Sequence, residues 1–391
     1  MDPKPTAPAL PSRLRSIDLL RGVAALGVLC FHSLPPVGAA GPGALFYLPW
    51  LVINHGFLGV PLFFVISGFC IHLRWAKSYA QTKNENVDFL EFWKRRLHRL
   101  YPPYFVMVCI SMAFMLLAYH QGRADIYPNP KLRWIGLDFL AHITMLHGFS
   151  PLFDQAGGNP PMWTLAREEY FYILYFALLA WRRTRHLAAT VGAVLLIGWG
   201  FALAAHLLVP ADSPWWKVIN NSALVLWIQW VLGMVAVEAY YGLVKLPRWC
   251  SSPWLVPVWL VLGEASLNFC PQLSNLLRGM TFFTLVNYCV DLEKAGRWPE
   301  HRVLNWLSGV GIFSYSIYLV HNPVINILGH LLDPHLNPLH RGPALLGMAI
   351  KILVGFNVAR LFYWLVERHF LNTKPKPASV PLVPELSASS T

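Results

Sequence analysis

The stretch IDLLRGVAALGVLCFHSLP, residues 17–35, decides the fold of this chain. About 20 mostly apolar residues in a helix span a bilayer, because each adds about 1.5 Å of rise. The run nevertheless carries Arg21 and His32, and ionisable side chains within a span usually face the protein interior or a water-filled cavity. Eleven positions separate them, so at about 100° per residue both lie on one helix face, about 16 Å apart along the axis. This shared face favours a function over a snorkelling arginine and a packed histidine.

The composition indicates a membrane protein. The chain is 55% hydrophobic and 13% charged, whereas a soluble domain carries about 25% charged residues. A net charge of +12 would suit a protein that binds nucleic acid. Here, however, the basic residues cluster in short loops between apolar runs, where they set the orientation of the chain in the membrane. We therefore expect no nucleic-acid partner. The six cysteines form no CxxC pair, so the sequence indicates neither a disulfide framework nor a metal site.

Apolar runs of span length recur and predict an all-α, polytopic integral membrane protein with about ten transmembrane helices. After the first run, they lie at about 57–74, 99–118, 163–181, 187–209, 219–242, 254–270, 275–291, 306–331 and 343–367. Residues 134–148 are apolar but short for a span, and they hold Asp138, His142 and His147. We therefore expect one re-entrant or interfacial segment there.

The lysines and arginines orient these spans. With ten spans and re-entry at 134–148, most of the basic residues fall on one side, which the positive-inside rule makes the cytoplasm. Both termini are then cytoplasmic. We expect residues 1–16 and 371–391, which are rich in proline and polar residues, to be disordered tails of one membrane domain, residues 17–370.

Two arginines stand at the cytoplasmic mouth of the third span. Arg96 and Arg99 are three positions apart, on neighbouring positions of one helix face. Two guanidiniums together suit a phosphate or pyrophosphate better than a single charge does. Ordinary anchoring of the helix end is the alternative. In the first span, Asp18 lies one turn before Arg21 and is close enough to pair with it.

An acidic residue lies inside the span at 163–181. Glu168 is about five residues into it and needs a partner, and His32 is expected at comparable depth. An Arg167–Glu169 pair is possible and would leave Glu168 unexplained.

Other polar side chains within the spans suit helix packing. Ser67 beside Gly68 allows close approach of two helices, and hydroxyls in the span at 306–331 suit interhelical hydrogen bonds. The chain contains no GxSxG, Walker A, GxGxxG or HExxH motif, so the usual hydrolase, nucleotide-binding and metalloprotease signatures are absent.

These motifs, in this order, resemble acyltransferase family three, polytopic bacterial enzymes that O-acylate sugars and related hydroxylated acceptors. The matching elements are Asp18-x-x-Arg21-Gly22 with Phe31-His32, Gly59-Val60-x-Leu62-Phe63-Phe64-x-x-Ser67-Gly68, Arg96-x-x-Arg99-x-x-Pro102, Trp163-x-Leu165-x-x-Glu168 with Phe171-Tyr172, and Ser314-Tyr315-x-x-Tyr318-Leu319-x-His321-x-Pro323. The resemblance covers about residues 15–370. Two positions depart from the pattern: Pro61 stands where an acidic residue is common, and His369 replaces a proline after Glu367.

The resemblance implies a membrane O-acyltransferase, with acyl-CoA, specifically acetyl-CoA, as the donor substrate. Arg21, Arg96 and Arg99 would hold its phosphates. His32 would be the catalytic base that takes the proton of the attacking hydroxyl, and Glu168 would orient it. The expected supporting residues are Asp18, Ser67, Trp163, Tyr172, Ser314, Tyr315, Tyr318 and His321.

The expected acceptor is a carbohydrate or lipid-linked sugar that meets the acyl group at the outer half of the bacterial cytoplasmic (inner) membrane, among membrane lipids. O-acylation of a secondary metabolite is an alternative. A second class also fits these intramembrane charges: a transporter or exporter coupled to protons. The acyl chain length, the oligomeric state, and the choice between direct transfer and an acyl-imidazole are open at this level.

Overall fold

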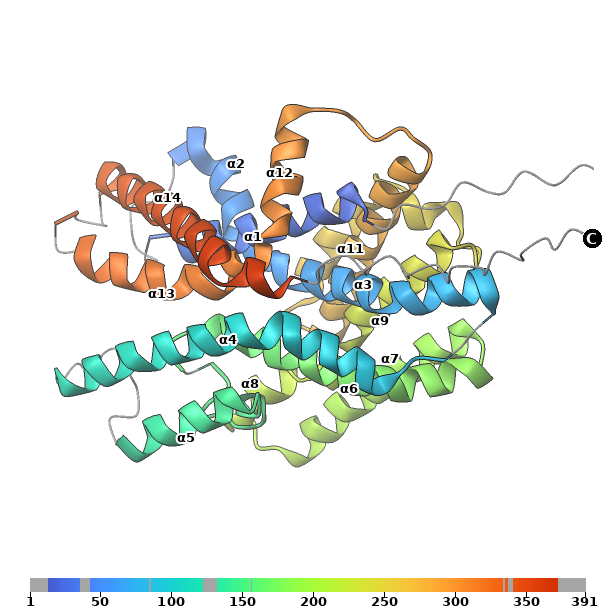
Figure 1. The fold of residues 1–391 in the computed structure, drawn as a ribbon, viewed down its shortest axis with the longest axis horizontal. Coiled ribbons are helices and arrows are strands. Elements are labelled where there is room, and N and C mark those ends of the chain that lie inside the picture. Colours follow the sequence, from blue (N-terminus) through green and yellow to red (C-terminus); the bar gives the residue numbers. More distant parts are fainter. Residues whose placement is uncertain are drawn as a thin grey trace, which may run out of the picture.

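The computed structural model describes residues 13–35, 43–83, 86–121, 132–155, 157–332, 335–336 and 340–371. Within these ranges the chain forms helices joined by turns and contains no strand (Figure 1). The all-α fold class is therefore confirmed. The predicted tails fall for the most part on residues 1–12 and 372–391, which lie outside the described residues.

Fourteen α-helices follow one another in the described residues. They are α1 (Arg15–His32), α2 (Gly43–Asn54), α3 (Gly59–Thr82), α4 (Phe89–His120), α5 (Leu132–Ile143), α6 (Trp163–Thr184), α7 (Leu187–Leu208), α8 (Trp215–Asn220), α9 (Ala223–Tyr240), α10 (Leu255–Ser266), α11 (Pro271–Lys294), α12 (Arg302–Ile312), α13 (Ser314–Leu332) and α14 (Arg341–Leu365). Short 3₁₀ turns precede α3 (η1, Gly56–Leu58) and α6 (η3, Pro160–Met162), and another follows α14 (η5, Glu367–Phe370).

Helix α1 lies in the middle of the bundle. It packs on α3, α12 and α13 and also contacts α11 and α14, while α3 packs along α9 (Figure 1). Its first turn is held from α11, because the carboxylate of Glu293 accepts the backbone N–H groups of Arg15 and Ser16, each at 2.8 Å. These are donors that a helix start cannot satisfy internally. The helix that carries Arg21 and His32 is thus fixed from its N-terminal end.

Helices α1 and α12 cross at backbone contact distance. A Cβ atom added at Gly311 would lie 1.8 Å from the carbonyl oxygen of Asp18, and one at Gly22 would lie 2.2 Å from that of Leu307. No side chain fits at either position. Glycine on both helices is therefore what brings α12 up against the segment that carries Arg21.

Helices α3 and α9 meet in the same way. A Cβ atom at Gly68 would lie 1.9 Å from the carbonyl oxygen of Trp230, and the indole nitrogen of Trp230 lies 3.3 Å from the hydroxyl oxygen of Ser67. The close packing predicted for the Ser67-Gly68 pair is confirmed.

The span predicted at 306–331 is broken. Helices α12 and α13 pass together as one apolar stretch of span length, but they are bent by 76° relative to one another, a break that the sequence did not predict. Side chains satisfy the polar backbone at the break. The hydroxyl of Ser314 donates to the carbonyl of Gly311 at 2.9 Å, and a carboxylate oxygen of Glu367 accepts both the backbone N–H, at 3.0 Å, and the hydroxyl of Ser316. Irregular backbone inside a membrane protein needs such partners.

Five helical stretches of the described residues are long and apolar enough to cross a membrane, or six if the bent α12–α13 pair counts as one. They are Gly56–Thr82, Phe89–His120, Leu187–Leu208, Trp215–Tyr240 and Gly342–Leu365. The other predicted spans fall on α1, α6, α10 and α11. These helices are shorter or more polar than the five stretches named above. A membrane fold is supported, and the ten-span arrangement stays a prediction.

The segment predicted to re-enter forms the short helix α5 and a following turn. Its polar side chains are buried against one another. A carboxylate oxygen of Asp138 lies 2.9 Å from Nδ1 of His142, and the rings of His142 and His147 stack with centroids 4.0 Å apart. The hydroxyl of Tyr104 on α4 donates to the backbone carbonyl of His142 at 2.8 Å. These contacts hold the short helix α5 and the turn after it inside the protein; re-entry of this segment into the bilayer stays a prediction.

Candidate active site

Three arginines from two helices line one cavity, which we call the arginine cavity. Arg21 comes from α1, and Arg96 and Arg99 come from α4. The space between its walls has an empty volume of about 860 Å³, open solvent included. Its other polar wall residues are Ser67, Cys70, Thr164, Glu168, Tyr172, Ser314, Tyr315, Tyr318 and Glu367.

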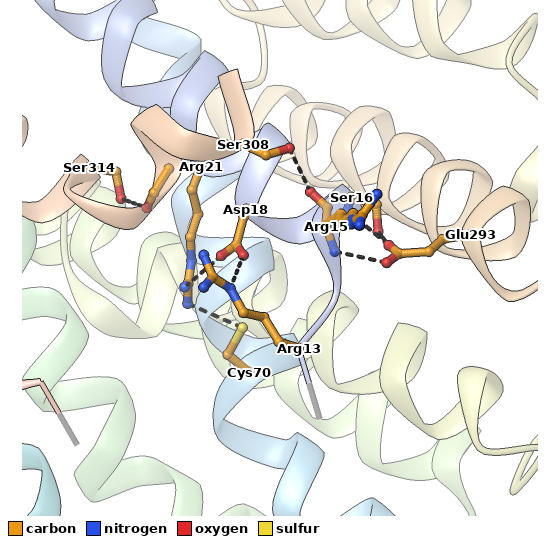
Figure 2. A network of polar contacts seen from close by, with 10 residues as sticks. Arg13, Arg15, Ser16, Asp18, Arg21, Cys70, Glu293, Ser308 and Ser314 are labelled. Atoms are coloured by element: carbon orange, nitrogen blue, oxygen red, sulfur yellow. Dashed lines mark hydrogen bonds and ion pairs between the residues drawn. The ribbon is translucent and has the colours of Figure 1, made fainter. Parts of the chain in front are cut away.

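Arg21 is held by its neighbours on two helices (Figure 2). Its Nη1 atom lies 3.8 Å from a carboxylate oxygen of Asp18, and its Nη2 atom donates to Sγ of Cys70 on α3 at 3.3 Å. Asp18 also accepts a hydrogen bond from Arg13. The pairing predicted between Asp18 and Arg21 is therefore confirmed, and Asp18 lies behind Arg21 as seen from the cavity, whose wall it does not join.

Arg96 and Arg99 add two cations to the same wall. The Arg96 guanidinium lies over the rings of Phe92 and Tyr172, 5.8 and 5.7 Å from their centroids. Within the part of the chain that the structure describes, neither arginine forms a salt bridge with a carboxylate. Two carboxylates, Glu168 and Glu367, line the same cavity without a short ion pair to either arginine. Guanidiniums placed in this way can bind phosphate oxygens through charge-assisted hydrogen bonds.

Glu168 joins the arginines rather than His32. One of its carboxylate oxygens accepts a hydrogen bond from the Tyr172 hydroxyl at 3.2 Å, and Ser67 lines the same cavity. The charged groups that act on it are Arg96 and Arg21. The contact with His32 expected from the sequence is not formed among the described residues, because α6 turns this face towards α3 and α4.

His32 ends α1 and is oriented by the backbone of its own helix. Its Nδ1 atom lies 3.0 Å from the carbonyl oxygen of Val28. A carbonyl can only accept, so Nδ1 carries the proton and Nε2 is the acceptor nitrogen of the neutral ring. The ring of His321 on α13 lies beside it, with centroids 5.0 Å apart. His321 is fully buried, and its Nδ1 atom bonds in the same way to the carbonyl of Ile317.

His32 lines a second cavity, which we call the histidine cavity. This cavity has an empty volume of about 970 Å³. It shares three wall residues with the arginine cavity, namely Val60, Phe64 and Tyr318. The Tyr318 hydroxyl accepts from Thr164 at 2.6 Å and donates to the carbonyl of Pro161 at 3.2 Å. The two cavities are therefore neighbours, separated by a thin wall.

The predicted site residues thus divide between two places. Those in the arginine cavity are Arg21, Ser67, Arg96, Arg99, Glu168, Tyr172, Ser314, Tyr315 and Tyr318. His32 and Trp163 line the histidine cavity, with Tyr318 in the wall between and His321 behind His32. Pro61, one of the two departures from the family pattern, also lines the histidine cavity.

Arg167 does not pair with Glu169, the possibility raised by the sequence. It is fully buried, and its guanidinium bonds to the Asp154 carboxylate and to the backbone carbonyls of Asn221 and Gly148. Burial raises the pKa of the Asp154 carboxyl, and the Arg167 guanidinium acts against that rise. Arg167, on α6, thus joins the loop before α6, through Asp154, to the turn before α9, through Asn221.

Several site residues escaped the sequence reasoning. Glu367 was noted as part of a motif without a role, yet it caps the broken end at α13 and lines the arginine cavity. The histidine cavity also holds Asn221, Gln229 and Asn275. The available signal was weak: Gln229 is one amide within a long apolar run, and such a residue is more often an interhelical hydrogen-bonding group.

Comparison with known proteins gives one family. A family model described as "Acyltransferase domain" matches residues 14–364. No solved structure matches the chain.

Curated relatives agree with that model. The chain is 29% identical over 338 residues to "O-acetyltransferase OatA" of Staphylococcus aureus, covering 81% of this chain and 51% of that protein. It is 25% identical over 378 residues to "Putative peptidoglycan O-acetyltransferase YrhL" of Bacillus subtilis, covering 90% and 54%. It is 30% identical over 366 residues to "Putative membrane-bound transacylase BcsY" of Komagataeibacter xylinus, covering 91% and 83%. The chain thus spans about half the length of the first two.

Proposed function

Because the chain belongs to acyltransferase family three, whose domain model matches most of its length, we propose that it is a membrane O-acyltransferase. In this proposal it moves an acetyl group from acetyl-CoA to a hydroxyl of a carbohydrate acceptor. The observation that carries the proposal is the shared wall between a cavity with three arginines and a cavity with one accessible histidine. A two-substrate transfer needs two such neighbouring sites.

The arginine cavity is the donor site. Coenzyme A carries phosphates, and Arg21, Arg96 and Arg99 offer guanidiniums that no carboxylate salt bridge within the described part of the chain fully occupies. Each charge-assisted bond to a phosphate contributes about 1.5–3 kcal/mol. The pantetheine arm then points the thioester across the Val60–Tyr318 wall towards His32.

His32 is the base in the direct route. The acceptor hydroxyl attacks the thioester carbonyl, its proton passes to Nε2 of His32, the C–S bond breaks, and the proton returns to the CoA thiolate as it leaves. The Val28 carbonyl maintains the tautomer that this step needs, the part first expected of Glu168. A route through an acyl-imidazole uses the same nitrogen as the nucleophile.

The membrane arrangement in this proposal is the one expected from the sequence. Ten spans with a re-entrant segment at 134–148 place both termini in the cytoplasm of a multi-pass bacterial inner-membrane protein. Acetyl-CoA enters from the cytoplasm, and a sugar or lipid-linked sugar is acetylated at the outer half of the bilayer. The name of the Bacillus subtilis relative, with peptidoglycan as its acceptor, supports a carbohydrate. A hydroxylated secondary metabolite is the alternative acceptor.

Purified protein in lipid nanodiscs, without any gradient, tests the proposal. We expect radiolabelled acetyl-CoA and deacetylated glycan fragments to give CoA and a base-labile acetyl ester. Empty nanodiscs serve as the control. A proton-coupled transporter would bind the same ligands without turnover in the absence of a gradient. Absence of acetyl-CoA consumption by folded protein, across glycan and small hydroxylated acceptors, would overturn the proposal.

A further inference from the structure

The polar wall of the histidine cavity is built largely from side-chain amides. Gln155, Asn221, Gln229 and Asn275 line it, and they come from the loop before α6, the end of α8, α9 and α11. An amide offers both a donor and an acceptor. A hydroxyl also donates and accepts, so four amides around one space match a ligand with several hydroxyl groups.

The protein holds the Gln229 amide and the backbone of Asn221 in place. The Nε2 atom of Gln229 donates to the backbone carbonyl of Asn275 at 3.0 Å, which leaves its Oε1 atom as the acceptor. The backbone carbonyl of Asn221 accepts from buried Arg167. Such preorganisation is typical of a binding site, because the polar groups need not reorder when the ligand arrives.

The cavity carries a neutralised cation. Arg278 is the only Lys, Arg, Asp or Glu among the described residues that line it. Its Nε and Nη2 atoms bond to the two carboxylate oxygens of Glu264 at 2.8 and 2.9 Å, and its guanidinium lies 5.4 Å from the Phe57 ring centroid. The two cavities differ in this respect. The arginine cavity presents three guanidiniums to a ligand, whereas the one arginine of the histidine cavity is already paired with Glu264.

Apolar ring surfaces complete the wall. Phe31, Phe57 and Trp163 line the cavity together with Pro160 and Pro161. Aromatic side chains offer large rigid apolar faces, and the C–H face of a sugar ring is the apolar counterpart of its hydroxyl edge. His32 lies on the same wall, so a ring bound here brings a hydroxyl to the base.

We propose that the histidine cavity is the acceptor site and that it selects an uncharged, hydroxyl-rich sugar ring through Gln229, Asn275 and Asn221, against the Trp163 and Phe57 rings. This inference rests on the proposed function and adds to it the class of acceptor and the residues that recognise it. Uronic acids and phosphorylated sugars are disfavoured, because Glu264 already pairs with the only cation of the described wall.

Methyl glucoside and methyl glucuronide form a matched pair of probes, one neutral and one anionic. The parent protein should acetylate the neutral glycoside with the higher kcat/KM. Asn275→Ala and Asn221→Ala should each raise the KM for methyl glucoside about 3- to 10-fold, as expected for one lost hydrogen bond. Asn357→Ala, at an exposed asparagine on α14, is the matched control. Two variants on different elements keep the test valid if one fails to fold.

Glu264→Gln tests the charge argument directly. It releases the Arg278 cation, so the ratio of kcat/KM for the glucuronide over the glucoside should rise about tenfold, a gain typical of one charge-assisted hydrogen bond. Equal use of both glycosides by the parent, or parental acceptor KM values in both asparagine variants, would overturn this inference and leave the acyltransferase activity standing. Transfer to neither glycoside, with acetyl-CoA hydrolysis intact, would also overturn it. A parent that consumes no acetyl-CoA at all would overturn the proposed function itself.

Discussion

Arg21 lines the arginine cavity, and His32, eleven residues later on the same helix, lines the histidine cavity. One rigid element therefore positions both side chains, Arg21, to which we assign phosphate binding, and His32, to which we assign the role of base. Helix α1 is fixed at its start by Glu293 and along its length by the crossing with α12. The separation of the two side chains along one helix, about 16 Å by helix geometry, suits a long donor whose phosphates and thioester lie far apart.

Arg96→Ala combined with Arg99→Ala should raise the KM for acetyl-CoA at least tenfold with little change in kcat, because phosphate contacts hold substrate and transition state alike. Lys94→Ala is the matched control, since Lys94 is an exposed cation on the same helix. Steady-state kinetics with varied acetyl-CoA measure the effect. Loss of protein from the membrane, with normal kinetics in what remains, would show that the arginines only anchor the helix.

Glu168→Gln should lower kcat/KM for acetyl-CoA roughly tenfold or more, because the partly buried carboxylate that acts on Arg21 and Arg96 loses its charge. Glu169→Gln should do much less, because Glu169 does not line the arginine cavity. The pH–rate profile separates two roles. The limb that belongs to His32 should stay in place in Glu168→Gln, since the two side chains are not in contact. A shift of that limb would restore the His32–Glu168 pair expected from the sequence.

Gly311→Ala should destabilise the protein by about 1–3 kcal/mol or more, because the new methyl group overlaps the backbone of Asp18 and overpacking has that cost. Gly309→Ala, two positions away on α12, is the control. A Cβ atom there meets nothing within 4 Å, so the change should be neutral or stabilising by about 0.5–1 kcal/mol. Thermal unfolding in detergent measures both. Equal melting temperatures for the two variants would contradict the close crossing of α1 and α12.

Much of the arginine cavity could be predicted from the sequence. A charged residue inside an apolar run needs a partner or a cavity, which indicated Arg21 and Glu168. The three-residue spacing of Arg96 and Arg99 at the mouth of a span indicated an anion site, and the structure brings all four residues to one wall. The partner of Glu168 could not be predicted. Span limits give the approximate depth of a residue, whereas the rotation of α6 about its axis decides which neighbour it meets.

The break between α12 and α13 could not be predicted from the sequence either, for a different reason. A kink in a helix is usually marked by a proline inside it, and here the only proline of the predicted span, Pro323, lies within α13, well after the break. The bend follows instead from tertiary contacts, with Gly311 pressed against α1 and Glu367 bonded to Ser316. The amides of the histidine cavity were missed because they are far apart in sequence and converge only in the fold.

The central claim is that Nε2 of His32 accepts the proton of the acceptor hydroxyl. The most direct test is the rate of acetyl transfer by His32→Ala, measured together with the Kd for acetyl-CoA, with His206→Ala at an exposed position of α7 as the control. The account predicts a loss of about 10²–10⁴-fold in kcat, the usual contribution of a general base, with an unchanged Kd, because His32 does not line the donor cavity. Transfer within a few-fold of the parent rate, in folded protein, would contradict it.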